Sequence, residues 1–443
     1  MGILNRLFGS PIPPAAKPDI TFGRYSDTYK EASKYEAWDQ ALDAFEAGDY
    51  LDSYQFFFTY LRDDHEDNVR FHTEDGTLHF ELFQGSRKIT GFADRQILKA
   101  EAKIAKAASL NVGFMRRLLE KNFHLKYSKF ALDPDNNIVI LFDTFAVDGS
   151  PYKLYYALKE LATNADKQDD LLLDEFSILQ PIDTSHIFPL PYPEKEAKYD
   201  FLQTQLTQVL HELDQLDEDR ESFPGGTAYL LLDVVYKTDY LLKPEGYLME
   251  TLERVHRKYF EEDGQTTRQK NSRLRKEMEQ LLKRSKEDYF KEFYRVVATF
   301  GITNPINHDR VLSFIDSELN QMDWYRDNGF PAVALAIPGY IIGYCLFNYA
   351  LPKPDRELFH LFYEITEAPF FKTLGFQDSL YDPDSGKFDQ KAIRKAIDQI
   401  VTNNRKRFPN LQANTATLDF SNLTAFCRSF LLMVRNMDMV KLT

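Results

Sequence analysis

The most regular hydrophobic pattern in the chain is the alternation of apolar and polar residues that flanks Asp75-Gly76 within residues 69–82. Asp-Gly is typical of a two-residue β-turn because both positions adopt a positive φ. Closing this turn fixes the strand register and sends alternate side chains to opposite faces. The predicted pairs are Val69 with Leu82, Arg70 with Glu81, Phe71 with Phe80, His72 with His79 and Thr73 with Leu78.

The flanking patterns extend this hairpin into an α+β domain over residues 36–176, with an antiparallel sheet packed on helices. Apolar residues at helical spacing precede the hairpin, and short apolar runs and further helical patterns follow it. We expect two short helices within 38–61, a third strand at 87–92, a helix at 97–119, a strand pair that turns at 133–137, and a closing helix at 151–169.

The corner of that strand pair, Asp133-Pro-Asp-Asn-Asn137, could be a turn or a calcium loop. Asp accepts backbone hydrogen bonds and Asn tolerates left-handed φ, which favours the turn. An EF-hand loop needs Gly at its sixth position and Glu at its twelfth, where this chain has Ile138 and Thr144. The same comparison predicts a turn at the second Asp-Pro-Asp, residues 382–384.

The strand predicted at residues 138–142 is apolar on both faces. An antiparallel strand with one solvated face would alternate apolar and polar residues instead. We therefore expect its second side to be covered by the C-terminal domain, by a second protomer or by a bound partner segment.

The rest of the chain divides at proline-rich stretches. Pro11, Pro13, Pro14 and Pro18 predict a flexible leader over residues 1–35, and further prolines predict an extended linker over 177–198. An all-α domain is expected over 199–443. Its expected helices lie at 199–219, 229–240, 247–260, 274–300, 311–324, 358–366, 393–401 and 423–437, with a break at Pro224-Gly225-Gly226.

Residues 328–352 carry no charge, which makes them long and apolar enough to span a bilayer. The spacing of Gly339 and Gly343 also matches a helix-pairing pattern of membrane proteins. Pro331 and Pro338 interrupt the segment, however, and its flanks give no clear orientation signal. We therefore expect the buried central helix of a soluble domain and no membrane association.

Composition limits the partners of the chain. It has 443 residues, 43% of them hydrophobic and 14% aromatic, which is ample for two packed domains. The net charge of −14 would repel phosphate backbones, so we expect no nucleic-acid binding. Basic residues exceed acidic ones between 268 and 286, where we expect a solvated helix face. Cys345 and Cys427 lie in apolar helical patterns and suggest a reducing cytoplasm.

The order of the N-terminal elements resembles a known family. A helical start, three strands, a helix ending at Leu110-Asn111, a strand pair and a helix, with Lys129-x-x-Leu132-Asp133-x-Asp135 before residues 138–141, resemble the YbjN-like family of bacterial sensory transduction regulators. That family shares the type III secretion chaperone-like fold. Asn136-Asn137 stands where the family commonly has a glycine. The resemblance covers about residues 36–176 and implies a non-enzymatic, protein-binding role with no catalytic residue.

Candidate catalytic and metal-binding residues do not form a familiar motif. His211-Glu212 begins like a zinc-protease helix, but Gln215 replaces the second histidine. The predicted register places His72 opposite His79 on the solvated face, where two ligands alone make a poor metal site. Because neighbours on a helix point apart, the acidic runs at 63–64, 169–170 and 261–263 are poor acid–base pairs. We assign no catalytic, cofactor-binding or metal-binding residue, and no cofactor.

Three functions remain from the sequence, of which the third is peripheral membrane attachment through the N-terminal tip or residues 328–352, a hypothesis that flotation with lipid would favour. The first is a cytoplasmic protein-binding or regulatory module, chaperone-like, that captures a protein partner on an apolar sheet or groove while the helical domain covers or regulates it. A homodimer is compatible with this role. The alternative is a hydrolase-like enzyme with its site in the helical half, where folding would bring carboxylates to His308 or His360. A pocket with clustered carboxylates or histidines favours the enzyme, and an apolar groove favours capture.

Overall fold

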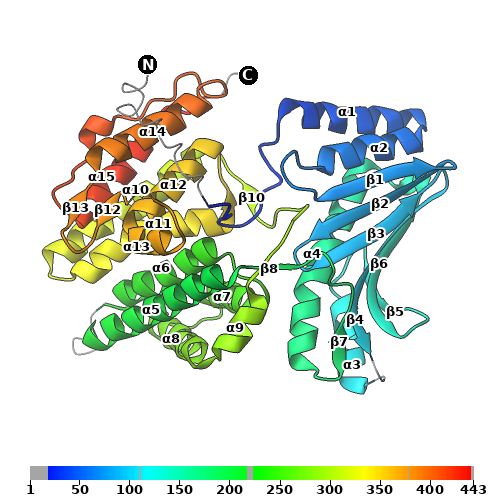
Figure 1. Ribbon diagram of the computed structural model, residues 1–443, viewed down its shortest axis with the longest axis horizontal. Coiled ribbons are helices and arrows are strands. Elements are labelled where there is room, and N and C mark those ends of the chain that lie inside the picture. The colour runs from blue at the N-terminus through cyan, green and yellow to red at the C-terminus, as the bar shows by residue number, and fades with distance from the viewer. Residues whose placement is uncertain (1–17, 108, 110, 217–222, 378, 441–443) are drawn as a thin grey trace, which may run out of the picture.

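The computed structural model describes residues 18–107, 109, 111–216, 223–377 and 379–440 (Figure 1). It is 57% helical and 15% strand, with an antiparallel sheet in the N-terminal part and helices after it. The expected α+β class is therefore confirmed at this level, whereas the chaperone-like identity of the sheet domain stays a prediction. The first 17 residues of the expected leader, with Pro11, Pro13 and Pro14, lie outside the described residues.

The N-terminal domain is a sheet with helices on one face. In sheet order its main strands are β1 (Val69–Glu74), β2 (Thr77–Gln84), β3 (Arg87–Ala93), β4 (Ile97–Ala107), β6 (Asn137–Phe145) and β5 (Lys129–Leu132). The helices are α1 (Ala32–Ala47), α2 (Tyr50–Leu61), α3 (Val112–Asn122) and α4 (Pro151–Glu175).

The predicted hairpin register is confirmed at every pair from Val69 with Leu82 to Thr73 with Leu78. Asp75 and Gly76 both have positive φ, at 47° and 78°, as the two-residue turn requires. The corner at Asp133 is also confirmed as a turn. Its carboxylate accepts the backbone N–H groups of Asp135 and Asn137, at 2.9 and 2.8 Å, and Asn136 has a φ of 61°. The second Asp-Pro-Asp turns between β12 (Tyr381–Asp382) and β13 (Lys387–Phe388).

The helix expected at 97–119 is wrong over its first half. Residues 97–107 form β4, which pairs with both β3 and β6 in the middle of the sheet. Alanine and lysine favour a helix by intrinsic propensity, and this misled the prediction. The buried positions Leu98, Ala100 and Ala102 in fact alternate with polar ones at a period of two. Small alanines at these positions let α4 pack closely on the strand.

The inner face of the sheet forms one apolar core with α2 and α4. On β6, Ile138, Ile140 and Phe142 belong to this core, while Val139 on the other face is also buried at 1% exposure. The main contacts of β6 run to β4, β5 and α4. The helical domain, one of the three covers expected for the second face of β6, docks instead near the β2–β3 turn. The other two, a second protomer and a bound partner segment, stay predictions.

The expected linker contains some regular secondary structure. It contains β7 (Leu179–Pro181), which pairs with β4, and β8 (Phe188–Pro189), and α5 (Tyr192–Leu216) begins inside it. The buried Arg87 fastens this stretch to the sheet, because its guanidinium donates to the carbonyl oxygens of Ile104 at 3.2 Å and of Ile182 at 2.8 Å.

The helical domain follows as a single apolar core. Pro224-Gly225-Gly226 starts a helix, where we expected a break, because proline is favoured in the first turn. Its helices are α6 (Pro224–Leu242), α7 (Gly246–Phe260), α8 (Thr267–Lys283), α9 (Lys286–Glu292), α10 (His308–Asp327), α11 (Pro331–Asn348), α12 (Lys353–Thr366), α13 (Ala368–Thr373), α14 (Gln390–Asn404) and α15 (Leu423–Arg435).

The single helix expected at 274–300 is wrong. The chain leaves helical geometry at Arg284, and Ser285 caps the short α9 by accepting a hydrogen bond from Asp288. After Glu292 the chain is extended, with β9 (Tyr294–Arg295) paired to β8 and β10 (Asn304–Pro305) paired to β11 (Tyr349–Ala350). Two consecutive β-branched residues, Val296 and Val297, favour this conformation.

The apolar segment at 328–352 forms α11, in agreement with the expected central helix. Among the described helices it is the one long and apolar enough to cross a membrane, and 72% of its most apolar stretch is buried. Gly339 and Gly343 let it approach α6, since a Cβ on Gly343 would lie 2.6 Å from the Cβ of Tyr236. The helix-pairing pattern therefore serves packing inside a core, as in a soluble protein.

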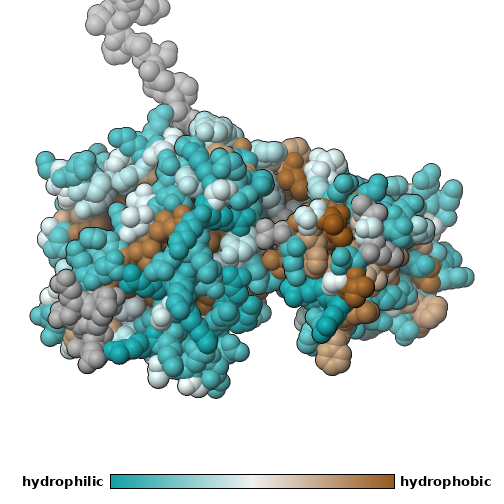
Figure 2. Space-filling model, turned by 90° about the horizontal axis from the view of Figure 1, so that it is seen from below, coloured by the Kyte–Doolittle hydropathy of each residue, from teal (hydrophilic) through white to brown (hydrophobic). Residues whose placement is uncertain are grey.

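The two domains lie side by side and each sends an extended segment to the other (Figure 1). One is the strap, residues 18–31, which precedes α1 and runs along the helical domain. The other is the clasp, residues 296–303, which crosses to the sheet domain between β9 and β10. Figure 2 shows a notch between the two lobes on the lower face, whose surface is mostly hydrophilic with separate apolar groups.

Candidate functional site

The clasp lies in a groove beside the end of β2 and has almost all of its central backbone groups bonded there. Gly85 donates its N–H to the carbonyl of Val297 at 3.0 Å, in an antiparallel bridge. The Gln84 side chain accepts the N–H groups of Thr299 and Phe300, at 3.2 and 2.9 Å, and donates to the carbonyl of Phe300 at 3.4 Å. One of these bonds pairs backbone with backbone, and the others run between the Gln84 side chain and the backbone of the clasp.

Three further side chains complete this recognition. The Thr299 hydroxyl donates toward the carbonyl oxygens of Asn68 at 3.1 Å and Phe83 at 2.8 Å. Asn68 donates from its amide to the carbonyl of Ala298 at 3.5 Å. Glu66 accepts the N–H of Ala298, and burial raises the pKa of its carboxyl above the ordinary value. The groove therefore contacts the backbone of the clasp, which any extended segment offers, and also the hydroxyl of Thr299, which is specific to this sequence.

The anchor of the clasp is Phe300. Its side chain is 1% exposed and belongs to the apolar core of the sheet domain, where its ring lies edge-on to Tyr155 at 5.7 Å. Burying a phenylalanine is worth about 1.5–3 kcal/mol by surface area alone. The backbone bonds thus give general affinity, and the Phe300 pocket gives selectivity.

The strap crosses directly over the clasp. A Cβ on Gly301 would lie 2.7 Å from Oδ1 of Asp27 and 3.0 Å from its backbone nitrogen, so only glycine fits there. Asp27 is itself buried and accepts a hydrogen bond of 2.6 Å from the hydroxyl of Tyr155. Burial and the Asp27 carboxylate both raise the pKa of Tyr155, which keeps the phenol protonated as the donor.

The strap makes the reciprocal contact on the helical domain. Phe22 packs against His360 at 5.1 Å and Phe371 at 5.2 Å, and Gly23 donates its N–H to the carbonyl of Tyr240 at 2.8 Å. Gly23 has a φ of 70°, and a Cβ there would lie 2.6 Å from the Tyr240 ring. The strap therefore docks as closely as the clasp does at Gly301.

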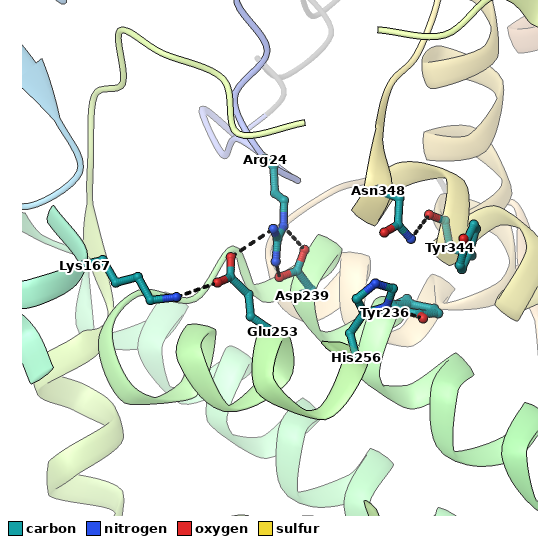
Figure 3. A network of polar contacts seen from close by, with 8 residues as sticks. All are labelled: Arg24, Lys167, Tyr236, Asp239, Glu253, His256, Tyr344 and Asn348. Atoms are coloured by element: carbon teal, nitrogen blue, oxygen red, sulfur yellow. Dashed lines mark hydrogen bonds and ion pairs between the residues drawn. The ribbon is translucent and has the colours of Figure 1, made fainter. Parts of the chain in front are cut away.

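A network of charges ties the strap to both domains (Figure 3). Arg24 donates to both carboxylate oxygens of Asp239, at 2.9 and 2.7 Å, and to Glu253 at 3.1 Å. Lys167 on α4 reaches the other oxygen of Glu253 at 3.1 Å. Burial works to raise the pKa of Glu253, but Arg24 and Lys167 hold it below its ordinary value. The network thus joins the strap, α6, α7 and α4.

The histidines of the enzyme hypothesis lie in different environments. His308 contacts the Asp355 carboxylate through Nδ1 at 2.8 Å, and both side chains are buried, at 7% and 0% exposure. His360 instead contacts Tyr240 at 3.1 Å and Glu364 at 3.5 Å. The His308–Asp355 pair is therefore enclosed by the helical domain. Burial also raises the pKa of the Cys345 and Cys427 thiols, which disfavours a reactive thiolate.

The other sequence candidates have structural roles. His72 and His79 are opposite each other as predicted, with ring centres 5.4 Å apart, and no third His, Cys, Asp or Glu forms a metal cluster anywhere in the described residues. Asp63 accepts the N–H groups of His65 and Glu66. His211 lies 3.1 Å from Gln215 on an exposed helix face. The side chains of Asp169 and Asp170 lie outside what the structure describes.

The basic stretch at 268–286 is paired with acidic side chains, as a solvated face would be. Arg275 bonds Asp214 at 2.5 Å, and Arg284 and Lys286 bond Glu292 and Glu196. The expected absence of nucleic-acid binding stays a prediction.

The sequence prediction placed the strap in a flexible leader, which is wrong for residues 18–31 because they dock on the helical domain, and it missed the clasp, although a signal exists. The tripeptide Thr-Phe-Gly occurs at residues 21–23 and again at 299–301, once in each segment. Each copy places its phenylalanine on the other domain, and its glycine lies where a larger side chain would clash with a neighbouring residue. The class of protein is thus an α+β domain and a helical domain joined by exchanged segments. No protein-family model and no curated protein matches the chain, so membership of the YbjN-like family stays a prediction.

Proposed function

We propose that this chain is a cytoplasmic, non-enzymatic protein-binding regulator whose N-terminal domain captures an extended segment with a phenylalanine-glycine anchor. The clasp occupies this groove in cis, so the helical domain regulates access to it. A protein partner with a similar segment would compete with the clasp. The observation that carries the proposal is the clasp itself: four consecutive residues bonded through their backbone and one phenylalanine in a core pocket.

The physical support is the type of contact. Hydrogen bonds to the backbone of the clasp accept any sequence, whereas the Thr299 hydroxyl and the deep Phe300 pocket add two sequence requirements. A tethered segment has a high effective concentration, so it blocks the groove until it is weakened or outcompeted. A chaperone-like fold, if the family resemblance holds, agrees with segment capture.

The test is binding of a fluorescent peptide of residues 294–303 to the full chain, followed by anisotropy. We expect weak binding to the wild type, because the clasp competes, and saturable binding to a Thr299→Ala/Phe300→Ala variant whose clasp is weakened. The same peptide with alanine at the Phe300 position should not bind. A variant that remains folded by circular dichroism but binds neither peptide would overturn the proposal. Equal binding of both peptides would show that Phe300 is not the anchor.

A further inference from the structure

A cavity of about 300 Å³ opens inside the helical domain, away from the clasp. Helices α5, α6, α11, α12 and α15 line it. Its walls include apolar side chains such as Leu230, Leu335 and Phe362. A space of this size holds a small organic molecule.

Charged groups line one part of this cavity. Lys237 donates to Oδ2 of Asp233 at 3.2 Å and to Glu367 at 2.9 Å, and these side chains are only 10–15% exposed. Glu212 lies on the wall as well. Among the described lining residues there are thus three carboxylates, those of Glu212, Asp233 and Glu367, and one ammonium, that of Lys237. The cavity carries an excess of negative charge that Lys237 cannot neutralise.

Two buried oxygen atoms in the lining have no hydrogen-bond partner among the described residues. They are Oδ1 of Asp233 and Oγ1 of Thr366. Asp233 is 7% exposed, and Gly339 makes room for its free oxygen, because a Cβ there would lie 2.0 Å from it. A buried carboxylate oxygen without a donor is costly, so a ligand that donates a hydrogen bond to it would relieve that cost.

We propose that this cavity binds a small organic cation, an ammonium or guanidinium group on an apolar body. The cationic group would donate to Asp233 and Thr366, and the apolar body would lie against Leu335 and Phe362. An anionic ligand would meet the surplus carboxylates, and a neutral apolar ligand would leave the buried oxygen of Asp233 unpaired. The site is separate from the clasp groove, so it stands independently of the proposed protein capture.

The test uses the full chain with benzylamine and cyclohexylmethylamine as probes, against benzyl alcohol and benzoate as neutral and anionic controls. Binding is measured by calorimetry and by the rise in Tm that a ligand of the folded state produces. We expect saturable binding of both amines and none of the controls. Asp233→Asn should weaken amine binding about tenfold or more, because one charge-assisted hydrogen bond is lost. Glu287→Gln, on an exposed position of α9, should leave it unchanged.

If Asp233→Asn does not fold, Thr366→Val tests the second oxygen with a side chain of the same shape and should weaken binding several-fold. Failure of both amines to bind would overturn the proposal. So would equal binding of benzyl alcohol, which would indicate an apolar pocket without charge recognition, or unchanged amine binding in the folded Asp233 or Thr366 variant.

Discussion

The strap and the clasp carry the same tripeptide but hold the two domains together by different means. Phe300 of the clasp is buried in an apolar core, and the backbone around it is bonded to Gln84 and Asn68. Phe22 of the strap is only half-buried, and the next residue but one, Arg24, supplies a buried ion network instead. In the clasp, the position that corresponds to Arg24 is Ile302, an uncharged residue that is 45% exposed.

This difference in contacts determines how each segment responds to pH, salt and competing segments. Apolar burial and backbone hydrogen bonds depend little on pH and salt, whereas ion pairs depend on both. The clasp is therefore expected to open by competition from another segment and the strap to loosen when its charges are changed.

Removing the clasp anchor should give the largest effect. Phe300→Ala leaves a cavity in the core of the sheet domain and should lower the free energy of unfolding by about 3–5 kcal/mol in urea denaturation. Phe22→Ala should cost less than half as much, because its side chain retains contact with solvent. Ile302→Ala is the matched control on the clasp, expected within about 0.5 kcal/mol of the wild type. Equal losses at Phe300 and Phe22 would erase the contrast between the segments.

Breaking the strap network should come next. Arg24→Gln leaves the buried Asp239 and Glu253 with less positive charge beside them and should cost about 2–3 kcal/mol. The exposed Arg116, which pairs only with Glu120 on its own helix, is the matched control, and Arg116→Gln should cost less than about 0.5 kcal/mol. Thermal unfolding at low salt measures both. A loss at Arg24 no larger than at Arg116 would mean that the network adds nothing to domain docking.

Removing the Gln84 side chain, which bonds the backbone of the clasp, should have a smaller effect. Gln84→Ala leaves the buried N–H groups of Thr299 and Phe300 without their acceptor and should cost about 1–3 kcal/mol. Gln55→Ala, which removes an exposed contact to Thr73, serves as the control with little loss expected. In the Thr299→Ala/Phe300→Ala background, where the clasp competes less, Gln84→Ala should also weaken peptide binding in trans, whereas unchanged affinity there would exclude recognition of the segment backbone by this residue.

The smallest effect is on pH dependence. Because the pKa of Glu253 in the folded protein lies below its value in the unfolded chain, its stabilising effect is complete above about pH 4.5 and is lost as the pH falls through the lowered pKa. Limited proteolysis within the strap should therefore speed up below about pH 4, while cleavage in the clasp should not. Identical acid sensitivity of both segments would contradict the division of roles.

Local patterns carried the successful part of the sequence prediction. The Asp75-Gly76 turn and the corner at Asp133 depend on neighbouring residues, so their geometry follows from the chain itself. The segment at 97–107 failed because Ala and Lys favour a helix locally, and only the sheet around β4 makes them a strand.

The candidate site could not be predicted from the sequence, for a different reason. Gln84 and Phe300 are 216 positions apart, and neither residue type indicates a binding groove by itself. The Asp233–Lys237 spacing does indicate a helical ion pair, but Glu367 joins it only through the tertiary fold. The repeated Thr-Phe-Gly was the one available signal, and its meaning depends on seeing each copy reach the other domain.

The most direct test of a separable segment site is native-state hydrogen exchange of the wild type, followed by mass spectrometry on peptides covering 19–25, 296–301 and 138–142. The strap peptide should exchange first, the clasp peptide second, and the β6 peptide only with global unfolding. Exchange of the clasp together with β6 would show that it is an inseparable part of the folding core, and a groove that never opens cannot admit a partner.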